Sequence, residues 1–352
     1  MSKEPILGVL DQSPIPRGTT AAESLQATVE LAQITEKLGY HRFWVAEHHN
    51  SGSFSGPSPE TMIGQIAART NSIKVGSGGV MLTHYSSFKV AEQFSVLNAF
   101  YPGRIELGIG RAPGSDQITM AALAYPKNPA DVNHFPQQVV DVLGYLNNTM
   151  VSEHPFAQLR PLPGPAPEET PEVWLLGSSD YSAQLAAELG VAFAFADFFG
   201  DIRSRGPVVA ELYRNNFKPS AYLDKPRVNV TVQAICAETE EKAEYLGASR
   251  NLNKAGWTLN IKPGLIPPDE ALEIELTDQA REWMGKFKSG YIDGNPSQVK
   301  AGILEVADLY QADEVGIVTI TYDYADRARS YELISQAFGL SSDSSVSQAA
   351  AG

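Results

Sequence analysis

Short apolar stretches alternate with helix-like stretches along most of this chain, and that alternation limits the folds available to it. Apolar residues on both faces of successive strands, with helices between the strands, are typical of a parallel sheet. Eight strand–helix units in 352 residues favour a closed (β/α)8 barrel, or TIM barrel, of the α/β class. An open doubly wound sheet would produce a similar alternation. The predicted strands are 6–10, 43–46, 73–82, 104–110, 173–177, 191–196, 227–237 and 314–321.

Helical spacing of apolar residues and helix-start signals define the stretches between the strands. The stretch 21–38, for example, ends at Gly39, and proline and serine stand at the start of 57–70. The predicted helices are 21–38, 57–70, 88–100, 134–147, 180–189, 203–217, 239–254, 297–310 and 324–338.

Residues 1–340 are predicted to form one barrel domain with two interruptions. The proline-rich stretch 154–172 is interpreted as a connecting loop. The stretch 256–293, inserted before the last unit, is long enough to act as a lid over a site. The tail 341–352 is small and polar, so we expect disorder there.

Composition and charge exclude several kinds of function. The balance of 27 basic and 41 acidic residues gives a net charge of −14, which argues against a surface for nucleic acid or anionic membranes. A single cysteine, Cys236, excludes intramolecular disulfides and a thiolate zinc cluster. The N-terminal stretch lacks a long apolar region, and no run of eighteen apolar residues occurs. We therefore expect a cytoplasmic protein.

In a barrel of parallel strands the carboxyl ends share one face, where active sites lie. Polar residues that follow the predicted strands are therefore candidates for the site. They are Asp11, Gln12, Glu47, His48, His49, Thr83, His84, Arg111, Gly177, Ser178, Ser179 and Asp197.

The trio Glu47-His48-His49 admits three interpretations. Adjacent residues in an extended chain point to opposite sides, so both histidines do not easily bind one metal, and no metal site is predicted. A histidine hydrogen-bonded in a loop is a second interpretation. Proton transfer or substrate binding is favoured, because imidazole titrates near neutral pH.

Two further stretches suggest a cofactor. Gly177-Ser178-Ser179 opens a helix whose free N–H groups, with Arg111 at a neighbouring strand end, are suited to a phosphate. An ordinary helix N-cap is the alternative. Gly76-Ser77-Gly78-Gly79 places three glycines in a strand, which indicates close packing against bare backbone, unusual backbone geometry or loose packing.

In this order, these stretches resemble the bacterial luciferase-like family of flavin-dependent monooxygenases, in particular its members of unassigned substrate. The resemblance covers residues 5–340. It is carried by WVAEHHNSG (44–52), VGSGGVML (75–82), PGRIELGIGRAPGSD (102–116), LLGSSDYSAQLAAELG (175–190) and GNPSQVKAGILEVADLYQADEVGI (294–317).

The resemblance implies a (β/α)8 barrel that binds reduced FMN (FMNH2) and uses O2 to oxidise a small organic substrate. A separate NAD(P)H:flavin reductase supplies the reduced flavin, and dimerisation through the first helices is expected, so a homodimer is predicted. The segment 256–293 matches the family's mobile loop. Gly110 and Ser178 depart from luciferase proper, so light emission is not implied.

The same resemblance assigns roles to individual residues. His48 matches the catalytic histidine. From its own chemistry, Glu47 would either orient His48 or form a structural pair with a nearby arginine. A non-proline cis peptide beneath the flavin is expected at Gly78-Gly79, and Ser77 is placed with them at the cofactor. The FMN phosphate site is expected at Arg111, Gly177, Ser178, Ser179 and Ser182. Asp11 and His84 are expected near the substrate.

Two other functions are compatible with these residues. One is an oxidoreductase of similar fold that uses the deazaflavin coenzyme F420. The other is a noncatalytic flavin-binding protein.

Overall fold

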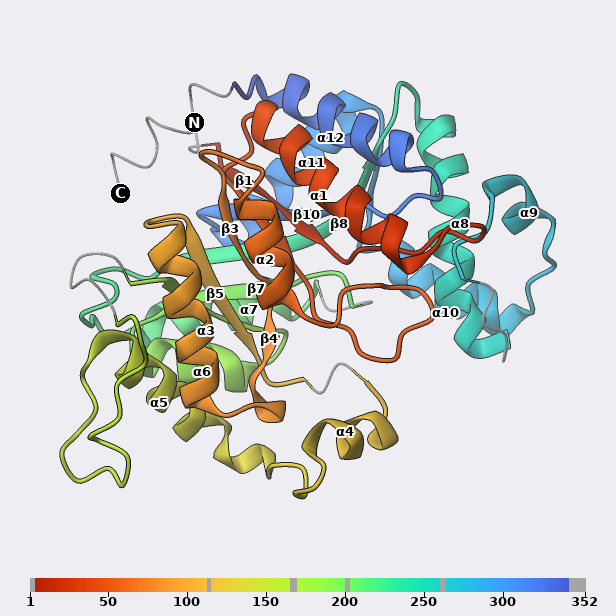
Figure 1. The fold of residues 1–352 in the computed structure, drawn as a ribbon. Helices are drawn as coiled ribbons and strands as arrows, with labels where there is room; N and C mark the ends of the chain where they lie inside the picture. Colours follow the sequence, from red (N-terminus) through yellow and green to blue (C-terminus); the bar gives the residue numbers. More distant parts are fainter. Residues whose placement is uncertain (1–3, 113–114, 165–169, 200–202, 260–263, 342–352) are drawn as a thin grey trace.

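A closed barrel of parallel strands forms the centre of the computed structural model, which describes residues 4–112, 115–164, 170–199, 203–259 and 264–341 (Figure 1). Around the barrel the strands follow the order β1, β2, β3, β5, β6, β7, β8 and β10. The last strand, β10, pairs in parallel with both β1 and β8, so the sheet has no open edge at that point. The predicted (β/α)8 barrel is confirmed, and the open sheet is excluded.

All eight predicted strands are present. The third is divided at the peptide between Gly78 and Gly79, which is cis as the resemblance implied. Both of its halves, β3 and β4, pair with β5. The additional strand β9 pairs with the end of β8. The strands are β1 (Ile6–Asp11), β2 (Arg42–Val45), β3 (Lys74–Ser77), β4 (Val80–Met81), β5 (Ile105–Gly110), β6 (Glu172–Gly177), β7 (Ala192–Ala196), β8 (Val228–Cys236), β9 (Ile292–Gly294) and β10 (Glu314–Val318).

Helices surround the barrel, and capping residues define several of their ends (Figure 1). Thr20 and Glu23 form a capping box at the start of α1, and Asn295 caps α11. In the described part of the chain no helix is long and apolar enough to cross a membrane. The helices are α1 (Ala21–Lys37), α2 (Pro59–Ala67), α3 (Ser87–Phe100), α4 (Gln117–Ala124), α5 (Phe135–Asn147), α6 (Asp180–Leu189), α7 (Gly206–Asn216), α8 (Glu240–Leu259), α9 (Pro268–Glu273), α10 (Asp278–Lys288), α11 (Pro296–Tyr310) and α12 (Tyr324–Phe338), with 3-10 turns η1 (Leu82–His84) and η2 (Val132–His134).

The inserted segment 256–293 contains the end of α8, all of α9 and α10, and the start of β9. It contacts the loop after β1, where the Arg17 backbone N–H donates to the Leu265 carbonyl at 2.7 Å and the Arg17 side chain is paired with Glu270. Leu265 is buried in a cluster with Leu10 and Trp44, which belong to the barrel strands. Residues 260–263, and the predicted disordered tail from 342 onward, lie outside the described residues.

The barrel interior is charged at the amino ends of its strands, which corrects the expectation of strands that are apolar throughout. Three basic and three acidic side chains alternate in a closed ring, each paired with both neighbours at 2.5–3.3 Å. Because every charge in the ring faces two opposite charges, burial is compensated. The ring runs through Arg42, Glu106, Lys74, Glu172, Arg227 and Glu314.

Candidate functional site

The carboxylate of Glu47, just beyond β2, is buried and holds three groups together. Its Oε1 lies 2.6 Å from Nε2 of His49 and accepts a hydrogen bond from the Tyr85 hydroxyl at 2.8 Å. Its Oε2 accepts from the Met81 backbone N–H at 2.9 Å. Glu47 therefore contacts His49 rather than His48. Burial and the Glu47 charge raise the pKa of Tyr85, which keeps its hydroxyl protonated as a donor.

The His48 imidazole packs against Phe54 rather than against the Glu47 carboxylate. Its ring lies 4.7 Å from the Phe54 ring, centre to centre. Among the described residues its Nδ1 is buried without a hydrogen-bond partner. Burial, then the charges of Lys254 and His49, lower the pKa of His48 to about 4. The ring is therefore neutral at pH 7 and has a nitrogen available to a bound molecule.

Two residues predicted near the substrate differ in their surroundings. His84, in η1, lies against His49 with ring centres 5.8 Å apart, so it belongs to the Glu47 cluster. The Asp11 carboxylate is buried and paired with Arg327 of α12 at 3.1 Å, and it also accepts from the Ser13 N–H. These contacts tie α12 to the end of β1. The second carboxylate oxygen of Asp11, Oδ2, is buried without a hydrogen-bond partner among the described residues.

The glycines of the third strand allow close approach of backbone and side chains. A Cβ on Gly78 would lie 2.5 Å from a methyl of Leu10, and one on Gly79 would lie 2.7 Å from the Gly108 carbonyl oxygen. The Ser77 hydroxyl is bonded to the Gly108 carbonyl and N–H at 2.9 and 3.1 Å. Close packing, and not loose packing, explains this stretch. The Ser77 hydroxyl thus joins β3 to β5 inside the barrel.

The predicted anion site is assembled where β5 and β6 end. Arg111 follows β5, and its guanidinium carbon lies 4.3 Å from the centre of the Tyr181 ring in the first turn of α6. Ser179 and Ser182 have their hydroxyl oxygens 3.2 Å apart. A Cβ on Gly177 would collide with the Ser182 hydroxyl, so glycine is what lets this serine lie over the strand end.

Ser179 is the N-cap residue of α6, but its side chain does not cap the helix, which leaves N–H groups of the first turn for an anion. Ser178 is exposed beside it. The carboxylate of Asp180, in the same turn, is paired with Arg205 at 2.6 Å. Exposed Arg111, serine hydroxyls and a helix N-terminus together fit the phosphate of FMN.

Sequence reasoning missed the contribution of α8 to this face. Asn253 donates to the Ser53 hydroxyl at 3.2 Å, which joins α8 to the loop after β2. The next residue, Lys254, lies close enough to His48 for its charge to lower the imidazole pKa. Nothing in the local sequence signals this contact, because it joins segments about 200 residues apart.

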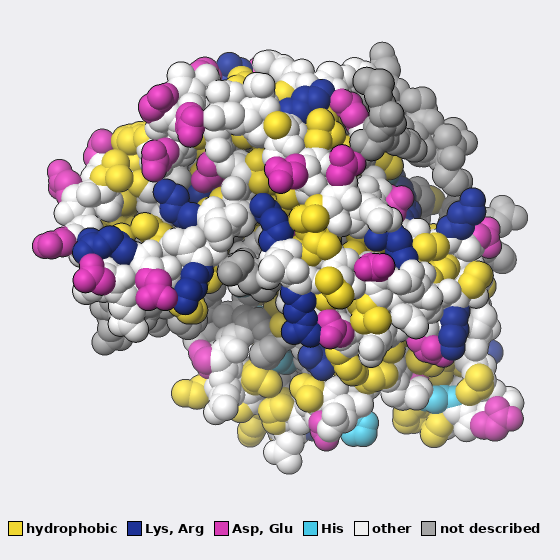
Figure 2. All heavy atoms as spheres, turned by 180° about the vertical axis from the view of Figure 1, so that it is seen from behind, with side chains coloured by type: hydrophobic (Ala, Val, Ile, Leu, Met, Phe, Trp, Pro, Cys, Tyr) yellow, Lys and Arg dark blue, Asp and Glu magenta, His cyan; other side chains and the backbone are white. Residues whose placement is uncertain are grey.

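The surface is hollowed on this side of the molecule. Viewed from behind, a depression separates the lobe that carries α8, α9 and α10 from the lobe that carries α4 (Figure 2). Both basic and acidic side chains lie around the depression (Figure 2).

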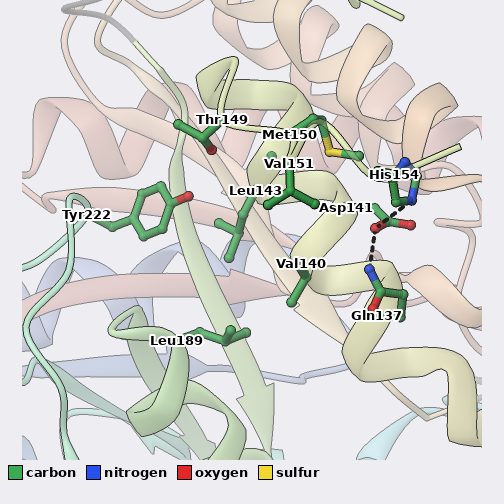
Figure 3. A pocket seen from close by; sticks show the side chains of 11 residues that line it. Gln137, Val140, Asp141, Leu143, Thr149, Met150, Val151, His154, Leu189 and Tyr222 are labelled. Atoms are coloured by element: carbon green, nitrogen blue, oxygen red, sulfur yellow. Dashed lines mark hydrogen bonds and ion pairs between the residues drawn. The ribbon is translucent and has the colours of Figure 1, made fainter. Parts of the chain in front are cut away.

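A second cavity, of about 160 Å³, lies outside the barrel between α5, the segment after it and the end of α6 (Figure 3). Gln137 and His154 both point toward Asp141, at 2.7 and 3.5 Å (Figure 3). No strand end lines this cavity, so it is separate from the candidate site. In the described part of the chain no three His, Cys, Asp or Glu side chains are grouped as a metal site.

The fold and the polar strand ends define a (β/α)8-barrel protein whose candidate site lies at the carboxyl face. The family model described as luciferase-like monooxygenase matches residues 6–310, and this chain belongs to that family. The predicted family is thus confirmed.

Curated relatives match over nearly their whole length. The uncharacterized protein YwcH of Bacillus subtilis strain 168 is 43% identical over 94% of this chain and 98% of its own. The luciferase-like monooxygenase of Escherichia coli K12 is 39% identical over 92% of this chain and 94% of its own. An N-acetyl-S-alkylcysteine monooxygenase of Bacillus subtilis strain 168 is 35% identical, covering 94% and 97%.

Solved structures share the fold. Apo-MsnO8 has a TM-score of 0.86 at 35% identity, covering 96% of this chain and 99% of its own. The oxygenating constituent of a Pseudomonas putida 3,6-diketocamphane monooxygenase, in complex with FMN, has a TM-score of 0.69 at 19% identity, covering 96% and 98%. A coenzyme F420-dependent secondary alcohol dehydrogenase has a TM-score of 0.67 at 12% identity, over 95% of this chain and 99% of its own. At such low identity, the last two show the fold alone.

Proposed function

We propose that this protein is a monooxygenase that uses FMNH2 and O2 to oxidise a small organic substrate, with FMNH2 supplied by a separate NAD(P)H:flavin reductase. The observation that carries the proposal is the position of Arg111 against the first turn of α6, beside the Ser179 and Ser182 hydroxyls. A cation, hydroxyls and helix N–H groups at one point suit a phosphate monoester. FMN carries this group and riboflavin lacks it.

The other residues have roles that follow from their contacts. The cis peptide between Gly78 and Gly79, which is only partly buried, would pack against the flavin ring, and the neutral His48 holds or accepts a proton at the reacting face. Glu47 positions His49 and Tyr85 beneath this face. Reduced FMN, when bound, supplies the electrons that activate O2. The segment 256–293 excludes water from the site as a lid.

The relative named N-acetyl-S-alkylcysteine monooxygenase suggests a first substrate to test. An N-acetylated cysteine thioether combines an oxidisable sulfur and carbon chain with a carboxylate.

Binding to three ligands tests the cofactor. We expect FMN to bind at least about tenfold more tightly than riboflavin, because a charge-assisted phosphate contact contributes about 1.5–3 kcal/mol. Coenzyme F420 is the third ligand, because an F420-dependent dehydrogenase shares the fold. Tight binding of F420 with none of FMN would replace the proposed cofactor. Unaltered oxygen consumption when protein is added to FMNH2 and substrate would instead favour a noncatalytic flavin-binding protein.

We also propose a homodimer formed through α3. On this helix Val96 and Phe100 are 41% and 74% exposed, an apolar surface that a second copy would cover. Light scattering at micromolar concentration should give twice the monomer mass, and Phe100→Glu should shift that mass toward the monomer. A monomeric wild-type protein would remove this proposal.

A further inference from the structure

Lys254 is a partly buried cation at the edge of the candidate site. It lies on α8, next to Asn253, whose amide is bonded to the loop after β2. Its Nζ lies 5.4 Å from the centre of the Phe287 ring on α10. The side chain is therefore enclosed between the barrel face and the inserted segment, where water solvates an ammonium poorly.

No carboxylate among the described residues pairs with Lys254. The charge that acts on it is that of Arg250, one turn earlier on α8, and this is also a cation. Arg250 itself is paired with Asp293. Burial, and then the charge of Arg250, lower the pKa of Lys254. A buried ammonium without a counter-ion is unfavourable unless a bound molecule supplies one.

His48 provides a second, independent sign of a missing partner at the same place. Its Nδ1 is buried and unpartnered among the described residues, and the Lys254 charge acts on its ring. The Lys254 ammonium creates a positive potential in a poorly hydrated site, and the neutral His48 ring can donate a hydrogen bond from Nδ1 in the tautomer that carries the proton there. An anion with hydrogen-bonding oxygens would satisfy both groups.

The FMN phosphate is not the anion expected here. The phosphate site lies at the ends of β5 and β6 and has its own cation, Arg111. Lys254 instead lies beside the loop after β2, and along the barrel β3 separates β2 from β5. One site can therefore hold the cofactor phosphate while the other holds an anionic group of a different molecule.

We propose that Lys254 binds a carboxylate of the organic substrate and so directs the remainder of that substrate toward His48 and the flavin. This inference rests on the proposed function and narrows its substrate class to small organic carboxylates. A neutral substrate of the same shape would leave the Lys254 ammonium without a counter-ion. The site therefore discriminates against neutral substrates, because binding one leaves a charge unpaired.

Matched pairs of ligands test this assignment on the FMN-loaded protein. The probes are N-acetyl-S-benzylcysteine, hexanoate and benzoate, each with its neutral methyl ester, and binding is measured by calorimetry. At least one acid should bind wild-type protein about tenfold or more tightly than its ester. Lys254→Met should remove this preference, and Lys254→Arg should retain most of it.

Lys286→Met provides the control, because Lys286 is an exposed lysine on α10 that is paired with Glu282. It should keep the full preference for the acid. The proposal is overturned if acids and esters bind wild-type protein equally, if none of them binds, or if the preference survives in Lys254→Met. Thermal unfolding of each variant verifies that it is folded.

Flavin absorbance, recorded before any acid is added, separates this inference from the function on which it rests. Failure of wild-type protein to bind FMN would contradict the proposed function. Normal FMN binding without acid preference would contradict only the role of Lys254. Loss of FMN, but not of riboflavin, in Lys254→Met would assign this lysine to the flavin phosphate and also overturn the proposal.

Discussion

Arg111 places its guanidinium over the ring of Tyr181, 4.3 Å from the ring centre, and thereby links the end of β5 to the first turn of α6. The stacking holds an exposed cation beside N–H groups that are not capped by the Ser179 side chain. The Arg111 cation after β5 and the free N–H groups of α6 after β6 thus form one candidate anion site.

Replacement of Arg111 by alanine should weaken FMN binding about 10–100-fold, because a charge-assisted contact to the phosphate is lost. Riboflavin binding should change little. Quenching of flavin fluorescence during titration measures both affinities. Arg160→Ala, on the connecting loop, removes an equal charge and should bind FMN normally. Equal losses for FMN and riboflavin in Arg111→Ala would rule out a phosphate contact.

Replacement of His48 by alanine should preserve FMN binding and lower substrate oxidation at least about 100-fold, the usual contribution of a positioned proton-transfer group. Because the pKa of His48 is lowered to about 4, its neutral form predominates from pH 5 to 8, and wild-type turnover should not show a histidine transition near 6.5. His154→Ala alters the outer cavity and should retain activity. Full turnover in His48→Ala would remove the proposed role.

The charged ring in the barrel should be sensitive to removal of one member. Glu106→Gln leaves Arg42 and Lys74 with an unpaired side and should lower the free energy of unfolding by about 3–5 kcal/mol. Glu92→Gln breaks the exposed pair with Lys89 and should cost at most about 0.5 kcal/mol. Urea unfolding measures both. If Glu106→Gln lowered the free energy of unfolding as little as Glu92→Gln does, the ring would not stabilise the barrel.

Acidification below pH 6.5 should destabilise the protein through two histidines. Burial and the neighbouring Arg42 lower the pKa of His41 to about 4, and His48 has a similarly lowered value. Between pH 6.5 and 4 the unfolded chain therefore binds protons that the folded chain does not, so stability falls as pH falls. The expected loss from pH 7 to 5 is about 1–2 kcal/mol for each histidine.

Urea unfolding at the two pH values tests this sign. His41→Asn should reduce the pH dependence, while the exposed His134→Asn should not. A protein equally stable at both pH values would contradict the effect of burial on these histidines.

The elements of the fold were predictable because their signals are local. Apolar runs located all eight strands, and periodicity with capping residues placed helices such as α6 and α12 within a residue of their observed ends. The divergence of His48 and His49 followed from the alternation of an extended chain. Arg111 and the α6 N-terminus came together because β5 and β6 are neighbours in the barrel.

Contacts between distant segments were not predictable in this way. The pairing of Glu47 with Tyr85 depends on how η1 turns after β4. The effect of the Lys254 charge on His48 depends on the position of α8, which Asn253 bonds to the loop after β2. The charged ring joins residues from the beginnings of six strands, and no signal within any one of these stretches identifies its partners. Periodicity carries no information about such partners.

Oxidation of substrate with isotopically labelled O2 and FMNH2 tests the central claim most directly. Purified protein, FMNH2 and a panel of N-acetyl cysteine thioethers and other small carboxylates would be incubated, and the products analysed by mass spectrometry. The proposed function predicts a product that contains one labelled oxygen atom and forms only when protein and FMNH2 are both present. Consumption of FMNH2 by FMN-binding protein without labelled product from any member of the panel would contradict it.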